Sequence, residues 1–263
     1  MRLILIVVGA LWGACSGLLL PRAAHRLSVD PEEPWNGNCP DGHPITGTFA
    51  GWLGRAHCTD TTGRYAYGPT TNNPSPSTPC GPYGPRTPAV STATALVCAA
   101  LAAATGPRPE LVVWLLAAPV AVLLALVDLR VHRLPDVLTL PLAAATLALL
   151  GIAAALPADA GSWPTALYGG LALGATYELL YLVNPAGMGF GDVKLALGLG
   201  TALGWYGWPV LVTGAFAGVL YGAVYGLGMV ALRRAGRKTA IPLGPFMLGG
   251  AFTGLLLGAF AVS

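Results

Sequence analysis

Eight apolar runs, each close to the length that crosses a lipid bilayer, dominate this sequence. A transmembrane helix needs about 20 predominantly apolar residues. Only 10% of the 263 residues are charged, whereas a soluble domain carries about 25%. The sequence therefore predicts an all-α integral membrane protein, a polytopic bundle of about eight transmembrane helices with one long polar loop. The runs lie near residues 3–20, 89–105, 111–129, 137–156, 164–183, 193–208, 209–232 and 242–262.

This pattern divides the chain into three parts. We expect residues 1–20 to form the first transmembrane helix, residues 21–88 the polar loop and residues 89–263 the membrane domain. A cleaved signal sequence is the alternative for the first run, because Gly13 to Cys15 are similar to a lipoprotein cleavage site. Trp12 fits poorly just upstream of such a site, so we expect a retained helix.

The distribution of Lys and Arg predicts the orientation in the membrane. If the N-terminus is outside, only Arg2 and Arg108 fall on the outer side. Cytoplasmic loops of membrane proteins carry an excess of Lys and Arg. We therefore expect the loop 21–88 and the segment 233–240 to face the cytoplasm.

The polar loop contains zinc-binding residue types without the spacing typical of zinc sites. It is rich in Pro, Gly, Thr and Asn, and such a segment does not bury enough apolar surface to form a core of its own. Cysteines stand at Cys39, Cys58 and Cys80, with His43 and His57 nearby. Zinc signatures commonly contain CxxC pairs, and this loop has none. We therefore assign no metal ligand and no cofactor, and zinc held by mixed loop ligands is the alternative.

Two aspartates stand beside apolar helices. Asp128 ends an apolar run in ALVDLRVHRLPD, and Asp192 follows Gly187, Gly189 and Gly191 in GMGFGD. An ionisable side chain in a membrane is costly and commonly functional. In the expected topology both carboxylates reach the same depth of the cytoplasmic leaflet. The glycines leave room for a substrate backbone and permit conformations closed to other residues.

Such a pair has the groups needed for peptide hydrolysis. One carboxylate takes a proton from water while the protonated partner hydrogen-bonds the scissile carbonyl oxygen. Structural roles are the alternative. Asp192 at a helix start fits a cap, whereas Asp128 at a helix C-terminus meets the unfavourable end of the helix dipole. His132, four residues on, is a candidate to compensate Asp128.

Neighbouring residues have simpler expected roles. Lys194 either tunes the pair electrostatically or extends to the lipid headgroups. Asp136 follows Pro135 at a helix start, where we expect a cap. Small residues at helical spacing let helices approach closely in lipid, and we expect this of Gly214, Gly218 and Gly222.

Three segments of the membrane domain carry a family resemblance. They are DLRVHRLPDVLTLPL (128–142), GMGFGDVKLALGLGTALG (187–204) and IPLGPFMLGGAF (241–252). The first resembles the first aspartate motif of the type IV prepilin peptidases, the second resembles their GxGD motif, and the third is similar to their closing IPFGPF-like motif. The three occur in the family's order, and the resemblance covers roughly residues 90–263.

The resemblance implies a membrane aspartyl endopeptidase, a hydrolase that uses two aspartates. Asp128 and Asp192 would be catalytic, and the active-site loop would contain Gly187, Gly189, Gly191 and Lys194. Its substrate would be a prepilin or pseudopilin of a type IV pilus or protein secretion system, which loses its basic leader at the cytoplasmic face. We expect a multi-pass protein of the bacterial inner membrane, with the lipid bilayer and no nucleic acid as partner.

Departures from the family pattern restrict this expectation. Members typically carry two CxxC pairs in the loop, where this chain has single cysteines, Cys39 and Cys58. The N-methyltransferase activity of many members is therefore not part of our expectation. The alternative functions are a proton- or cation-coupled transporter that uses the aspartates and a metal-dependent hydrolase that uses Asp128, His132 and Asp192.

Overall fold

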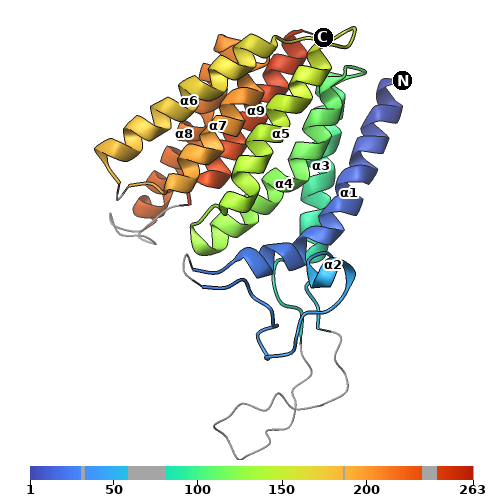
Figure 1. The fold of residues 1–263 in the computed structure, drawn as a ribbon, viewed down its shortest axis with the longest axis vertical. Coiled ribbons are helices and arrows are strands. Elements are labelled where there is room, and N and C mark those ends of the chain that lie inside the picture. Colours follow the sequence, from blue (N-terminus) through green and yellow to red (C-terminus); the bar gives the residue numbers. More distant parts are fainter. Residues whose placement is uncertain (31–32, 59–80, 186, 233–241, 263) are drawn as a thin grey trace, which may run out of the picture.

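The computed structural model is an all-helical bundle (Figure 1). It describes residues 1–263 except 31–32, 59–80, 186, 233–241 and 263. The helices in the described part are α1 (Arg2–Leu27), α2 (Thr48–Gly51), α3 (Thr87–Thr105), α4 (Glu110–Val131), α5 (Asp136–Ala154), α6 (Trp163–Val183), α7 (Phe190–Gly204), α8 (Trp208–Ala231) and α9 (Gly244–Ala261).

The predicted fold class is confirmed. Each apolar run overlaps one long helix, and seven of the described helices are long and apolar enough to cross a membrane. The remaining run corresponds to α7, which has 15 residues and is shorter than a typical span. The first helix continues past residue 20 to Leu27, through Pro21. Basic residues in its last turn, among them Arg26, favour this extension because they lie at the negative end of the helix dipole.

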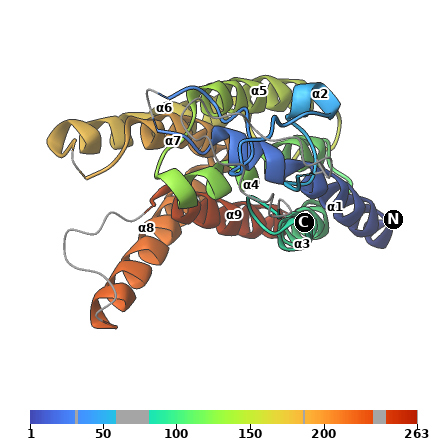
Figure 2. The ribbon, with the colours of Figure 1, turned by 90° about the horizontal axis from the view of Figure 1, so that it is seen from below.

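Close helix crossings depend on glycine. A Cβ at Gly13 of α1 would lie 2.8 Å from the Cα of Ala95 in α3, so α1 and α3 are in backbone contact. At the crossing of α8 and α9, a Cβ at Gly250 would overlap the backbones of Gly214 and Gly218. The predicted packing role of Gly214 and Gly218 is confirmed. Helix α8 leans away from the bundle and packs mainly against α9 (Figure 2).

The two ends of the bundle differ in chemistry. Both chain termini lie at one end, and α2 with the described part of the polar loop lies at the other (Figure 1). At the end with the termini, the fully buried Glu110 lies 3.6 Å from Arg108. Arg108 also donates a hydrogen bond to the carbonyl of Ala259, 2.9 Å away. These contacts join the start of α4 to the end of α9.

The orientation is testable with an introduced cysteine. Asp159 is exposed in the connection between α5 and α6, at the end opposite the polar loop. We expect Asp159→Cys to react with an impermeant thiol reagent added outside intact cells. The wild-type protein, whose loop cysteines are expected inside, should stay unlabelled. Labelling of Cys58 in the wild-type protein would show that the orientation in the membrane is opposite to the one expected.

The α8 and α9 crossing gives a stability prediction. Gly250→Ala forces the two backbones apart, and overpacking of this kind costs about 1–3 kcal/mol of unfolding free energy. Gly228→Ala in α8 is the matched control, because nothing lies within 4 Å of the position of its Cβ. Thermal unfolding in detergent should show a lower midpoint for Gly250→Ala alone. Equal midpoints for the two variants would contradict the close backbone contact of α8 and α9 at Gly250.

Candidate active site

Asp128 lies in the last turn of α4, where the sequence ends the helix. Helix α4 ends at Val131, and the following residue, His132, adopts a left-handed conformation with φ 50° and ψ 41°. Its backbone N–H still bonds the carbonyl of Asp128 at 2.9 Å. Pro135 follows, and a proline disfavours helical geometry in the residue before it. The chain therefore turns directly after Asp128 and begins α5.

The Asp128 carboxylate is held by the start of another helix. The side chain is buried, with 3% exposure, and its Oδ2 accepts a hydrogen bond from the backbone N–H of Gly244 at 2.9 Å. Gly244 is the first residue of α9, and the N-terminus of a helix attracts negative charge. His132 also interacts electrostatically with the carboxylate, as the sequence suggested. The unfavourable end of α4 is thus offset by the favourable end of α9.

Gly244 is a site residue that sequence reasoning did not single out. A Cβ at this position would lie 2.8 Å from Asp128 Oδ2, closer than real Cβ atoms approach such a neighbour. Only glycine therefore lets α9 begin against the carboxylate. The signal lay in the third motif, IPLGPF, which the resemblance identified as a segment without giving its glycine a role.

Asp192 lies in the first turn of α7 and is also buried, with 7% exposure. Its Oδ2 accepts a hydrogen bond from the N–H of Gly189, the N-cap residue, at 3.1 Å. The capping role that the sequence offered as the alternative is therefore present. Capping and catalysis are compatible, because one oxygen receives this bond and the other is left for further contacts.

The two carboxylates are close enough to interact electrostatically. Gly191 brings them together: its Cβ would lie 2.9 Å from the Cβ of Leu134, in the segment that follows α4. None of Gly187, Gly189 and Gly191 has a positive φ, so the expectation that they adopt conformations closed to other residues is wrong. At Gly191 the reason for glycine is close approach.

Lys194 and Asp136 contact each other. The ammonium of Lys194 lies 2.6 Å from Asp136 Oδ2 and 4.8 Å from the centre of the Phe190 ring. The expectation that Asp136 caps α5 is wrong, because Asp136 is already the first helical residue and its N-cap, Pro135, leaves the carboxylate free to reach α7. The pair joins the starts of α5 and α7 beside the carboxylates.

Tyr177 is a second neighbour that sequence reasoning missed. This α6 residue is buried and interacts electrostatically with Asp192. Its phenol is the kind of group that orients a carboxylate or a substrate carbonyl. The sequence signal was weak, because a tyrosine in an apolar helix is also a common packing residue.

An apolar cavity of about 270 Å³ lies inside the bundle, near the carboxylates. Its wall includes Ala125 one turn before Asp128, Leu195 one turn after Asp192, and Pro245 next to Gly244. Residues of α3, α4, α5, α7 and α9 complete the lining. The cavity therefore offers apolar surface one helical turn from Asp128 in α4 and one turn from Asp192 in α7.

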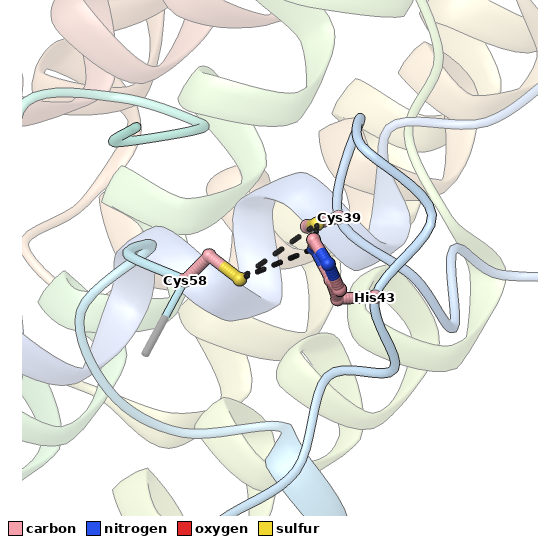
Figure 3. A group of neighbouring side chains, drawn as sticks. All are labelled: Cys39, His43 and Cys58. Atoms are coloured by element: carbon pink, nitrogen blue, oxygen red, sulfur yellow. Dashed lines mark hydrogen bonds between the residues drawn. The ribbon is translucent and has the colours of Figure 1, made fainter. Parts of the chain in front are cut away.

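The expectation that the polar loop forms no core of its own is wrong for the described part of the loop, which has a small one. Cys39, Ile45, Ala56 and Tyr83 are buried together. Burial raises the pKa of the Tyr83 phenol above its ordinary value. Of the five possible zinc ligands in the loop, Cys39, His43 and Cys58 lie together (Figure 3). His57 lines the adjoining cavity, and Cys80 lies outside the described residues.

Comparison with known proteins identifies relatives of the membrane domain. Residues 115–227 match the model of the Type IV leader peptidase family, and this range contains both aspartates. A protein of Aeromonas hydrophila named prepilin leader peptidase/N-methyltransferase is 34% identical over 178 residues, which are 67% of this chain and 60% of that protein. A protein of Pseudomonas aeruginosa with the same name is 36% identical over 140 residues, 51% of this chain and 46% of that protein.

These matches cover parts of the relatives. A third protein with this name, from Legionella pneumophila, is 31% identical over 173 residues, 63% of this chain and 57% of that protein. The chain thus matches 60% or less of each of these relatives. No solved structure is a significant match.

Proposed function

Because residues 115–227 belong to the type IV leader peptidase family, we propose that this protein is a membrane aspartyl endopeptidase. Its substrate is a prepilin or pseudopilin, and it removes the basic leader at the cytoplasmic face of the bacterial inner membrane. The family match supports the type of reaction. The observation that carries the proposal is the pair of buried, interacting carboxylates on α4 and α7.

The surroundings of the pair fit this chemistry. Asp128 and Asp192 each receive one backbone N–H on Oδ2, which fixes the carboxylate planes without neutralising either charge. Two carboxylates close together in an apolar site share one proton. The ionised member takes a proton from water as it attacks, and the protonated member hydrogen-bonds the carbonyl oxygen of the scissile bond. The leaving amine then receives the proton that came from water.

The apolar cavity supports a substrate that arrives from the bilayer. A prepilin-like substrate has an apolar segment after its basic leader, as the resemblance implies. Such a segment would contact the wall that includes Ala125, Leu195 and Pro245. Because the segment comes from lipid and not from water, its contacts with this wall would gain from van der Waals packing, while the leader stays with the polar groups at the cytoplasmic end. The scissile bond between them would then lie at the carboxylates.

The alternative functions have less support. A coupled transporter places its ionisable groups near the bilayer midplane, whereas Asp128 is in the last turn of α4 and Asp192 in the first turn of α7. For a metal-dependent hydrolase, His132 would have to join both aspartates. Within the described residues, the only group of His, Cys, Asp or Glu that could hold a metal is in the polar loop.

The proposal covers cleavage alone. The relatives' names also include N-methyltransferase, and the two CxxC pairs typical of the family are not found in this chain. Mass analysis of the cleaved substrate reports both reactions. Cleavage removes the mass of the leader, and N-methylation adds the mass of a methyl group to the amino terminus of the mature product. Cleavage without this change is the outcome that matches the proposal.

The pair predicts that each aspartate is indispensable. Asp128→Asn and Asp192→Asn should each lower cleavage of a co-expressed prepilin at least about 100-fold, because an amide neither shares the proton nor takes one from water. The amide oxygen still accepts the backbone hydrogen bond, so both proteins should remain inserted and abundant. The double variant should be no worse than either single one, as for residues that act as a unit.

Asp136→Asn is the matched control for these variants. It also replaces a carboxylate by an amide, but Asp136 is exposed and pairs only with Lys194 in the described contacts. Such exposed pairs contribute about 1 kcal/mol or less, so cleavage should stay near wild type. Near wild-type processing by Asp128→Asn or Asp192→Asn would refute the aspartyl mechanism.

Gly244 predicts a steric effect on the same reaction. Gly244→Ala places a methyl group against the Asp128 carboxylate, and displacement of a reacting group by about 1 Å can cost about 100-fold in rate. Gly228→Ala is the control, because it is the same substitution in α8 with nothing within 4 Å of the position of its Cβ and Gly228 does not line the apolar cavity. Cleavage rates at equal protein abundance test the difference. Equal rates would show that α9 does not position Asp128.

A further inference from the structure

Three donor atoms of the polar loop converge on one point (Figure 3). The Nδ1 atom of His43 lies 3.5 Å from the sulfur of Cys39 and 3.7 Å from the sulfur of Cys58. The two sulfur atoms are 4.0 Å apart. The cluster joins two segments that are separated along the chain, so local sequence spacing did not reveal it.

These distances fit a tetrahedral zinc ion. Zinc binds thiolate sulfur at about 2.3 Å and imidazole nitrogen at about 2.0–2.1 Å. Tetrahedral angles then place two sulfur ligands about 3.8 Å apart and a sulfur and a nitrogen ligand about 3.6 Å apart. The separations within the triangle of Cys39, His43 and Cys58 lie within about 0.2 Å of these values. An ion therefore fits between the donors without movement of the chain.

The backbone already holds the donors in position. Cys39 to His43 form a tight turn, in which the N–H of Cys39 bonds the carbonyl of His43 at 2.8 Å. The N–H of Gly42 bonds the carbonyl of Cys39 at 2.9 Å, and Gly42 has the positive φ of 84° that favours glycine. On the other side, the N–H of Tyr83 bonds the carbonyl of Ala56, just before Cys58.

A fourth coordination position has space. The three residues line a cavity of about 280 Å³ together with Arg22, His57 and Tyr83 among others. One water molecule occupies about 30 Å³, so a water ligand fits. Three protein ligands with water in the fourth position are the arrangement known from catalytic zinc sites.

A disulfide is the main alternative for the two cysteines. A disulfide bond is about 2.05 Å long, and the sulfur atoms of Cys39 and Cys58 are 4.0 Å apart with the His43 ring beside both. A disulfide would also leave the imidazole without a role. The loop is expected to face the cytoplasm, where thiols stay reduced.

We propose that Cys39, His43 and Cys58 form a zinc site that clamps the polar loop. The donor set differs from the two CxxC pairs typical of the family that this chain resembles. On binding, both thiols lose their protons to solvent and the imidazole binds as the neutral base. Two thiolates balance the charge of Zn²⁺. The clamp joins the turn at Cys39 to the segment at Cys58, and Arg22 of α1 bonds the carbonyls of Thr46 and Arg55 beside it.

Metal content tests the proposal directly. The protein is purified in detergent, without chelator and with an affinity tag free of histidine, and its zinc is measured by mass spectrometry. We expect about one zinc ion per chain. His43→Ala and Cys58→Ser should each lose most of this zinc, whereas Cys15→Ser, which removes a cysteine of α1, should keep it. Wild-type protein with almost no zinc, or full zinc in Cys58→Ser, would overturn the proposal.

A conservative variant and a spectroscopic probe guard against misfolding. His43→Cys replaces the imidazole by a thiolate and should keep the zinc that His43→Ala loses. Wild-type protein stripped by a chelator and reloaded with Co²⁺ should show the thiolate-to-cobalt absorption of a tetrahedral site. Absence of that absorption, or loss of zinc in His43→Cys with retention in His43→Ala, would contradict the assignment. None of these measurements depends on cleavage activity.

Discussion

A carboxylate buried in an apolar bundle must receive hydrogen bonds, because a buried charge without them is costly. Here each aspartate of the pair meets this requirement at the N-terminus of a helix. Asp128 receives the N–H of Gly244 at the start of α9, and Asp192 receives the N–H of Gly189 at the start of α7. The second bond lies within the start of α7, whereas the first joins two helices. The first brings together α4 and α9, which are far apart in the sequence.

Glycine makes those meetings possible. Gly244 lets α9 begin directly against Asp128, and Gly191 lets α7 begin against Leu134, just after α4. The motifs GMGFGD and IPLGPF therefore contain glycines that are needed for close packing, in addition to any chemical role of the motifs. The polarity of the site comes from the aspartates and the backbone, while the glycines set the distance between them. A larger residue would press on the Asp128 carboxylate at position 244 and on Leu134 at position 191.

The sequence predicted more of the fold than of the site. Apolar runs gave the helix positions because a bilayer-crossing helix needs a fixed length of apolar residues, and they located Asp128 and Asp192 at helix ends. Local sequence cannot report a contact between helices, so the role of Gly244 was not predicted. The same limit applied to Asp136, whose partner, Lys194, is on another helix. Sequence reasoning gave it a local cap instead.

The polar loop shows the same limit for metal ligands. Spacing rules detect ligands that share a turn, whereas Cys58 reaches the turn of Cys39 from a separate segment. The loop also contacts the membrane part of the site, since Arg133, between α4 and α5, donates a hydrogen bond to the carbonyl of Asp30 at 2.9 Å. The segment that follows Asp128 is thereby attached to the chain that leaves α1. A change in the position of Asp30 would therefore act on the segment that follows Asp128 through the Arg133 side chain.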